Sequence, residues 1–303
     1  MNDSNFTVSY EIRSPERGTS LENYMMQLTP LLSFKPSFVS IANHQPEEKF
    51  ITGTDGNLKK AIPDRYPATY FFSVALKERF GVDVIPHLLC NELDPEIIDD
   101  ILLGFHYVGI KKIMALRGDR TSNNLRFPNR YSYSSDLVKH IVEFGNNYNI
   151  VFDIGIAGYP EKHPAAVSFE DDLAVLKDKI RLGASFITTQ MFLDNGRFYS
   201  FLDRCKVDHI FVPIYPGLKL ILKPSNLDQY SDRFQIEIPN KLKSSFSSSY
   251  EDNHKKTGEN WLFEQCNQLI KDGHNHLHFY VFSKDDMIGV FNVISKLKRQ
   301  YYG

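Results

Sequence analysis

Short apolar runs alternate with amphipathic stretches along almost the whole chain, and this alternation limits the fold more than any other feature. Apolar runs of strand length occur at 8–12, 37–42, 83–90, 111–116, 150–158, 185–190, 210–217 and 276–282. Stretches with helical spacing occur at 20–34, 67–80, 94–109, 135–147, 168–183, 196–207 and 285–299. Strands that are apolar on both faces are typical of a parallel sheet that is covered on both sides. The pattern therefore predicts an α/β fold built as a single (β/α)8 barrel of the TIM type.

Residue types at the ends of the predicted helices agree with these boundaries. Asp94 stands before Pro95 at one helix start, and Ser168 and Asp171 have the spacing of a capping box at another. Gly183 follows that second helix, as glycine commonly does at a helix end. The alternative is a doubly wound sheet, but no G-x-G-x-x-G follows the first apolar run, so the usual dinucleotide-fold signal is missing.

Two segments break the rhythm of strand and helix. Residues 44–67 predict a long loop after the second strand. Residues 218–275 are too long for one connecting helix, and they include a polar, serine-rich stretch at 244–260. We interpret 218–275 as an extended insertion between strands seven and eight, either a helical extension or a mobile lid. The whole chain, 1–303, is expected to be one barrel domain that carries this insertion.

Composition excludes several classes of protein. The chain is 42% hydrophobic and 24% charged, which is ordinary for a soluble protein, and its net charge of −2 gives no reason to expect nucleic acid as a partner. The N-terminus has no apolar core of signal-peptide length, and no run approaches the roughly 20 apolar residues of a membrane span. Cys90, Cys205 and Cys266 lie far apart, without metal-ligand spacing. We expect a cytoplasmic protein with reduced thiols, no metal site and no membrane partner.

The fourth apolar run stops abruptly at Arg117, Gly118 and Asp119. This tripeptide has three interpretations: an ordinary exit from a strand, an adhesion motif, or the rim of an active site. The expected cytoplasmic location argues against adhesion. In a (β/α)8 barrel the carboxyl ends of the strands form the active-site face, so the third interpretation depends on what else stands at those ends.

Polar side chains stand at the carboxyl end of most predicted strands. They are Glu11, His87, Arg117, Asp119, Tyr159, Glu161, His163, Gln190 and Tyr215. Together they predict a polar mouth that could hold a phosphate-bearing or heteroaromatic ligand. No phosphate-binding loop and no serine-nucleophile elbow is present.

Each of these residues also has a purely structural interpretation. Glu11 could pair with Arg13 or Arg17 at the surface, and His87 could be a core histidine with its hydrogen bonds satisfied. Asp119 could cap its loop, and Gln190 could cap backbone groups. Similarly, Asp172 and Lys179 share one face of a helix, which could simply be its solvated face.

Several longer motifs occur in one fixed order: "PHLLC", "GIKKIMALRGD", "FDIGIAGYPEKHP", "DLAVLKDKIRLGASFITTQMFLDN", "FYSFLDRC" and "PIYPG". Together they closely resemble the methylenetetrahydrofolate reductases, over nearly the whole chain. In size the chain resembles the short bacterial form. The resemblance implies a (β/α)8 barrel that binds FAD and uses NADH or NADPH to reduce 5,10-methylenetetrahydrofolate to 5-methyltetrahydrofolate, which feeds methionine synthesis. It also implies a homo-oligomer.

The resemblance carries roles onto residues of this sequence. Glu11 is implied as the general acid, and Asp119 as a catalytic carboxylate that stabilises the cation formed from the folate. The implied flavin contacts are His87, Arg117, Gly118, Asp119, Ser134, Tyr159, His163, Ala166, Asp172 and Lys179. The implied folate contacts are Gln190, Asn226, Tyr230 and Lys284. These types suit the reaction, since opening the methylene bridge needs a proton donor and a nearby negative charge.

The chain departs from the family pattern at several positions. Ala42 and Asn43 stand where the family has a threonine near nicotinamide and a tyrosine near flavin. The other departures are Arg13, Ser14, Val175, Asp178 and Lys284. They leave open a non-catalytic or divergent flavin- or folate-binding homologue, acting as a subunit of a redox complex. A barrel lyase with a Schiff-base lysine would need a lysine that points inward, and Lys111 and Lys112 lie at the wrong end of strand four.

Overall fold

The computed structural model describes residues 6–16, 18–43, 49–52, 58–61, 69–91, 93–118 and 131–302. Within this part of the chain, no helix is both long enough and apolar enough to cross a membrane. The two ends of the described chain lie side by side, since the Tyr302 hydroxyl accepts a hydrogen bond from the Phe6 amide at 2.8 Å and donates to the Phe6 carbonyl at 3.0 Å.

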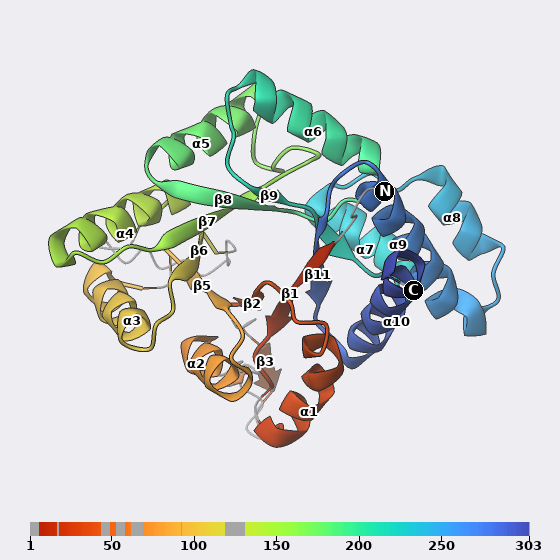
Figure 1. Ribbon diagram of the computed structural model, residues 1–303, viewed down its shortest axis with the longest axis horizontal. Coiled ribbons are helices and arrows are strands. Elements are labelled where there is room, and N and C mark those ends of the chain that lie inside the picture. The colour runs from red at the N-terminus through yellow and green to blue at the C-terminus, as the bar shows by residue number, and fades with distance from the viewer. Residues whose placement is uncertain are drawn as a thin grey trace.

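Nine parallel strands form one sheet in the order β10-β11-β1-β2-β5-β6-β7-β8-β9. They are β1 Thr7–Arg13, β2 Val39–Ala42, β5 Val84–Leu89, β6 Lys112–Leu116, β7 Asp153–Gly158, β8 Ala184–Thr189, β9 Ile214–Tyr215, β10 Gly217–Lys219 and β11 His276–Val281. The first and last strands in this order, β10 and β9, are separated in sequence only by Pro216. The sheet therefore closes on itself, and the predicted (β/α)8 barrel is confirmed, with helices around its outside (Figure 1).

The seventh predicted strand differs from its prediction. It was expected at 210–217, but it begins at Ile214 and continues to Lys219, interrupted at Pro216. Proline has no amide hydrogen to give to a sheet, so the ladder breaks there. The consequence is that Lys219 belongs to the barrel wall and not to the following loop.

Seven helices follow the strands much as the spacing predicts. They are α1 Leu21–Leu32, α2 Thr69–Phe80, α3 Pro95–Tyr107, α4 Ser134–Tyr148, α5 Phe169–Arg181, α6 Asn195–Val207 and α10 Lys284–Tyr302. The side chain of Ser168 accepts a hydrogen bond from the amide of Asp171 at 3.1 Å, so the predicted cap of α5 is present. Pro95 occupies the first turn of α3, as its fixed backbone angle favours.

The two irregular segments contain regular structure of their own. Between β10 and β11 lie α7 Ser225–Phe234, α8 Asn240–Ser247, the 3-10 helix η1 Glu251–Asn253 and α9 His254–Lys271. Within 44–67, where a loop was predicted, Lys49–Thr52 (β3) and Leu58–Ala61 (β4) form an antiparallel pair. These strands are only four residues long and rich in lysine, so they give no apolar alternation to read.

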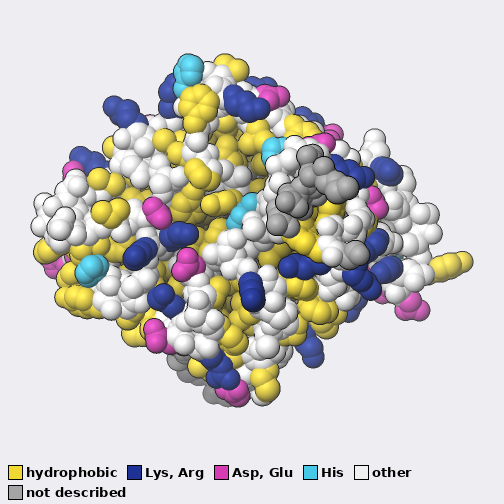
Figure 2. Space-filling view, in the orientation of Figure 1, with side chains coloured by type: hydrophobic (Ala, Val, Ile, Leu, Met, Phe, Trp, Pro, Cys, Tyr) yellow, Lys and Arg dark blue, Asp and Glu magenta, His cyan; other side chains and the backbone are white. Residues whose placement is uncertain are grey.

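The inside of the barrel contains both an apolar cluster and a group of buried polar side chains. Phe38, Ile85, Met114 and Phe186 form one buried cluster, with Leu116 and Tyr215 packed against it. Buried polar side chains gather on β1, β2, β5, β10 and β11; they are Ser9, Glu11, Ser40, His87, Lys219 and His278. On the face seen in Figure 2, hydrophobic side chains gather near the centre, over β8 and β9. The barrel wall thus concentrates its titratable groups on one side.

Candidate active site

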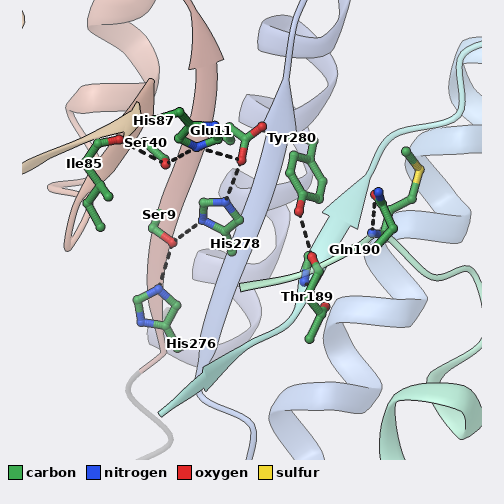
Figure 3. Close-up of polar contacts among 12 residues, drawn as sticks. Ser9, Glu11, Ser40, Ile85, His87, Thr189, Gln190, His276, His278 and Tyr280 are labelled. Carbon is green, nitrogen blue, oxygen red and sulfur yellow. Dashed lines mark hydrogen bonds and ion pairs between the residues drawn. The ribbon is translucent and has the colours of Figure 1, made fainter. Parts of the chain in front are cut away.

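Glu11 is the buried carboxyl group at the carboxyl end of β1, with only 8% of the residue exposed. Its Oε2 lies 3.5 Å from Nε2 of His87 on β5 and 4.0 Å from Nε2 of His278 on β11 (Figure 3). Three strands that are distant in sequence therefore bring one carboxyl and two imidazoles together. The surface ion pair proposed as the structural interpretation of Glu11 does not fit a side chain buried in this way.

The imidazole of His87 is held by Ser40 on the neighbouring strand β2. Ser40 Oγ lies 2.9 Å from His87 Nε2 and donates its hydrogen to the Ile85 carbonyl at 3.2 Å. A hydroxyl has one hydrogen, so when Ser40 donates to the carbonyl it accepts at its contact with His87. In that arrangement Nε2 of His87 carries a hydrogen, which can be directed either to Ser40 or toward Glu11, 3.5 Å away.

A second polar chain approaches Glu11 from the opposite end of the barrel. Ser9 Oγ lies 2.8 Å from Nε2 of His276 and 2.7 Å from Nδ1 of His278. The ring of Phe38 stacks on both imidazoles, with centroid distances of 5.6 Å and 5.5 Å. Burial lowers the pKa of His276 to about 3, with smaller effects of His278 and Lys112, and burial lowers the pKa of His278 to about 3. Both imidazoles are therefore neutral near pH 7.

The surroundings of Glu11 favour its protonated form. Burial raises the pKa of this carboxyl above its usual value, and the charges of His87, Arg13 and Lys219 oppose the rise. A buried carboxyl that keeps its proton to higher pH is suited to act as a general acid.

The predicted flavin contacts after β7 lie together. The ring of Tyr159 packs edge-on against His163 at 4.6 Å between centroids. Asp172 Oδ2 accepts a hydrogen bond from the His163 amide at 2.9 Å, and the His163 carbonyl accepts from the Ala166 amide at 2.9 Å. Asp172 therefore ties the start of α5 to the loop after β7, which is more than the solvated helix face of its structural interpretation.

Lys179, on α5, is the observation that best suits a phosphate-bearing cofactor. Among the described residues its ammonium makes no hydrogen bond or ion pair. Burial lowers the pKa of Lys179, and the nearby charge of Asp172 partly offsets that lowering. A half-buried cation that makes no hydrogen bond or ion pair with the described residues fits an anionic group of a bound dinucleotide. The residues present therefore fit FAD, with Lys179 and Arg117 as cations and the loop after β7 as a polar wall.

The tripeptide after β6 is described only in part, because Asp119 lies outside the described residues. The Arg117 guanidinium lies over the ring of Tyr133, 5.3 Å from its centroid, and Ser134 begins α4 as a buried residue. Gly118 has φ +87°, and a Cβ there would overlap the side chain of Asn91. Only glycine fits this backbone without strain.

The predicted folate contacts are spread around the rim. The side-chain oxygen of Gln190 accepts from the amide of Met191 at 2.9 Å, which agrees with its interpretation as a backbone cap. Asn226 accepts from the Leu222 amide at 3.3 Å, Tyr230 is half-buried, and Lys284 is the exposed first residue of α10. No hydrogen bond or ion pair between described residues joins these four.

Four buried polar residues around Glu11 were not expected from the sequence: Ser9, Ser40, His278 and Lys219. The signal that could have found Ser9 and His278 is the two-residue period of strands. Ser9 stands two residues before Glu11, and His278 stands within the alternating run at 276–282. A separate cavity of about 730 Å³ lies between α9 and α10, is lined by Phe34 and Lys296 among others, and contains none of the predicted site residues.

Comparisons with known proteins point in one direction. A family model described as methylenetetrahydrofolate reductase matches residues 1–297. The chain is 30% identical to the 5,10-methylenetetrahydrofolate reductase of Pectobacterium carotovorum over 282 residues, covering 92% of this chain and 87% of that protein. It is 28% identical to methylenetetrahydrofolate reductase 1 of Schizosaccharomyces pombe, covering 93% of this chain but only 44% of that longer protein.

One solved structure shares the fold across the full length. It is a protein of Clostridium thermocellum described as binding two copies of 5-methyl-5,6,7,8-tetrahydrofolic acid. The TM-score is 0.61 at 13% sequence identity, and the match covers 99% of this chain and 97% of that one. At this identity the likeness concerns the fold alone.

Proposed function

This chain belongs to the methylenetetrahydrofolate reductase family, and from that membership we propose that it reduces 5,10-methylenetetrahydrofolate to 5-methyltetrahydrofolate. The electron donor in this proposal is NADH or NADPH, acting through bound FAD in a ping-pong sequence. The product would feed methionine synthesis in the cytoplasm. The single observation that carries the proposal is the buried carboxyl of Glu11, which faces two imidazoles at the carboxyl end of the barrel.

Glu11 performs the acid step of the proposed reaction. Its proton passes to N10 of the folate, and the bond between N10 and the methylene carbon breaks, which leaves a cationic iminium at N5. Burial favours the protonated carboxyl before this step, and His87 can donate a hydrogen bond to the carboxylate after it. Burial and the His87 contact therefore stabilise Glu11 in turn before and after it gives up its proton, so the carboxyl can release the proton and take it back.

Residues around the mouth hold the cofactor in this proposal. Lys179 and Arg117 would bind its phosphates or ring carbonyls, and the loop of His163 and Ala166 would border it. When bound, FAD accepts a hydride from NADH or NADPH and supplies one to the methylene carbon. Asp119 is assigned the negative charge that stabilises the iminium, by resemblance to the family.

Anaerobic stopped-flow measurements of Glu11→Gln test the proposal. The flavin of the variant should be reduced by NADH or NADPH within about twofold of the unmodified rate, since this half-reaction needs no acid at N10. Its reoxidation by methylenetetrahydrofolate should slow by about 10²- to 10⁴-fold, the usual range for loss of a general acid. Glu16→Gln, an exposed carboxyl just beyond β1, is the matched control and should change neither rate.

Two results would contradict the proposal. If purified protein loaded with FAD is bleached by neither nicotinamide, the chain is not a nicotinamide-dependent reductase. A flavin that is bleached but never reoxidised by methylenetetrahydrofolate favours the second candidate, a flavin-binding homologue in a redox complex. The observation that favours that candidate is Ala42 and Asn43 at the end of β2, where the family resemblance implies nicotinamide and flavin contacts.

A further inference from the structure

Lys219 is a buried lysine inside the barrel that the proposed chemistry has not used. It is the last residue of β10 and only 5% exposed. Lys219 pairs in register with Tyr280 on β11, and Tyr280 pairs with Glu11 on β1. Residues at one level of neighbouring parallel strands point to the same face of the sheet, so all three point into the barrel. Figure 3 shows Glu11 and Tyr280 on this inner face.

The ammonium of Lys219 is fixed in place by its partners. Nζ donates to Asp286 Oδ2 at 2.7 Å and to the Tyr280 carbonyl at 3.2 Å, and it lies 5.1 Å from the ring centroid of Phe282. Asp286 is itself 2% exposed. Its Oδ2 also accepts from the amides of Phe282 and Ser283 at 3.0 Å, where α10 begins. A charge held this firmly can act on its neighbours without moving.

Both members of the pair are needed for the charge to persist. Burial lowers the pKa of Lys219, while Asp286 raises it, Arg13 lowers it and Glu11 raises it. The hydrogen-bonded carboxylate of Asp286 therefore keeps the amine protonated in a site that would otherwise favour its neutral form.

We propose that Lys219 is a positioning residue for the general acid: its fixed positive charge stabilises the carboxylate that Glu11 becomes once it has given its proton to the substrate. The inference rests on the proposed function. No bond to Lys219 forms or breaks; the proton leaves Glu11, and the ammonium offsets the negative charge that remains.

Other titratable groups also face Glu11, and a charge on any of them would also shift its pKa. They are His87 from β5, His278 and Tyr280 from β11, and Arg13 from β1. His278 is neutral near pH 7, and burial keeps the phenol of Tyr280 protonated. Arg13 is only half-buried, and its guanidinium lies over the ring of Phe282 at 4.7 Å. His87 and Arg13 each lower the pKa of Glu11 more than Lys219 does, but Lys219 is more deeply buried than Arg13 and better shielded from screening by solvent.

The expected size of the effect follows from strand spacing. Glu11 and Lys219 are two strands apart, so their backbones lie about 10 Å from each other. The attraction of unit charges at that distance, with the effective dielectric typical of proteins, corresponds to a pKa change of about one unit. The Asp286 carboxylate, 2.7 Å from the ammonium, offsets part of this attraction, so about one unit is the upper limit for removing the pair.

The test uses the double variant Lys219→Met/Asp286→Asn in the full chain loaded with FAD. Removing both charges leaves no unpaired buried ion, and Asn can still accept from the amides at the start of α10. We expect the midpoint of the Glu11 carboxyl, followed by the infrared C=O band that Glu11→Gln removes, to move up, by less than about one pH unit because the charge of Asp286 is lost together with that of Lys219. In stopped flow, the pH at which reoxidation by methylenetetrahydrofolate falls off should move up equally, with flavin reduction by NADH or NADPH unchanged within about twofold.

Three further results decide the inference. Lys219→Arg, which keeps the charge, should keep the midpoint of the unmodified protein. If the first double variant does not fold, Lys219→Gln/Asp286→Asn replaces it with the same expectation, since Gln can still reach the Tyr280 carbonyl. An unmoved midpoint in a folded double variant overturns the inference. The infrared midpoint needs no substrate, so the inference can fail while the unmodified protein still reduces folate, and the proposed function can fail while the midpoint still shifts.

Discussion

Ser40 and His87, on adjacent strands of the barrel, are joined by a hydrogen bond of 2.9 Å that fixes one imidazole beside the buried carboxyl of Glu11. The same hydroxyl lies 3.2 Å from the Ile85 carbonyl, so Ser40 links the imidazole to the backbone of β5. His87 has two open interpretations from the sequence, a core histidine or a ligand contact. The structure shows that His87 is buried and hydrogen-bonded, as a core histidine would be. It also lies 3.5 Å from Glu11, so a role beside the ligand agrees with the same geometry.

Ser40→Ala should release this imidazole without changing the apolar packing. We expect the free energy of unfolding to fall by about 1 kcal/mol, the usual net value of one buried hydrogen bond. We also expect reoxidation of the flavin by methylenetetrahydrofolate to slow about tenfold, because His87 no longer holds its orientation toward Glu11. Urea unfolding and stopped-flow absorbance measure the two effects. Ser33→Ala, on an exposed serine after α1, is the control, and an equal slowing in that variant would contradict the assignment.

The half-buried imidazole of His276 gives the stability of the fold a pH dependence. Its pKa is about 3 in the folded chain, against about 6.5 when unfolded, so the unfolded state takes up a proton first as the pH falls. The stabilisation is therefore fully present above pH 6.5 and is lost as the pH falls toward 3. Between pH 7.5 and pH 5 the loss from this group amounts to about 2 kcal/mol.

The variant His276→Gln should remove that part of the pH dependence. Its free energy of unfolding in urea should change between pH 7.5 and pH 5 by about 2 kcal/mol less than that of the unmodified chain. Glu11 acts in the opposite direction, since its raised pKa stabilises the folded state at low pH, and it is unchanged in both proteins. Equal slopes for the two proteins would show that His276 is not held neutral.

Position 118 should tolerate no residue larger than glycine. Its φ of +87° and the closeness of Asn91 mean that Gly118→Ala combines backbone strain with overlap. We expect a loss of about 2 kcal/mol in unfolding free energy, and weaker FAD binding, because the chain leaves β6 at this residue. Gly104→Ala is the matched control: Gly104 lies inside α3 with open space where a methyl group would stand, so this variant should gain about 0.5–1 kcal/mol. Thermal unfolding and fluorescence titration with FAD compare the two variants.

The elements that the sequence predicted well are those with a strong period. The apolar run at 83–90 became β5, and the capped stretch at 168–183 became α5, because burial and capping act locally and leave a readable pattern. The short pair β3 and β4 has no such pattern. Local sequence patterns therefore predict helices and strands, but they say much less about how those helices and strands pack against one another.

The candidate site divides in the same way. Glu11 and His87 were identified by motif and strand end, and their closeness follows from the closed barrel. Lys219 was missed because the seventh strand was expected to stop at Gly217, which left the lysine in a loop. Its ion pair joins residues 67 positions apart in sequence, a contact that only the packing of α10 against the barrel creates. The lyase interpretation required an inward lysine, and Lys219 is one, but its amine is bound to Asp286.

Lys179 predicts opposite effects on binding and on stability. In Lys179→Met a desolvated cation without a partner among the described residues is removed, so the protein without FAD should be equally stable or more stable. The affinity for FAD should fall about 10- to 100-fold, the range for one charge-assisted hydrogen bond. Lys177→Met is the matched control on the same helix, where the lysine makes an exposed ion pair of 3.9 Å with Asp208. Fluorescence titration with FAD, together with thermal unfolding of the apoprotein, separates the two variants. If Lys179→Met lowers apoprotein stability and leaves FAD affinity intact, the lysine is a structural residue of α5 and the phosphates bind elsewhere.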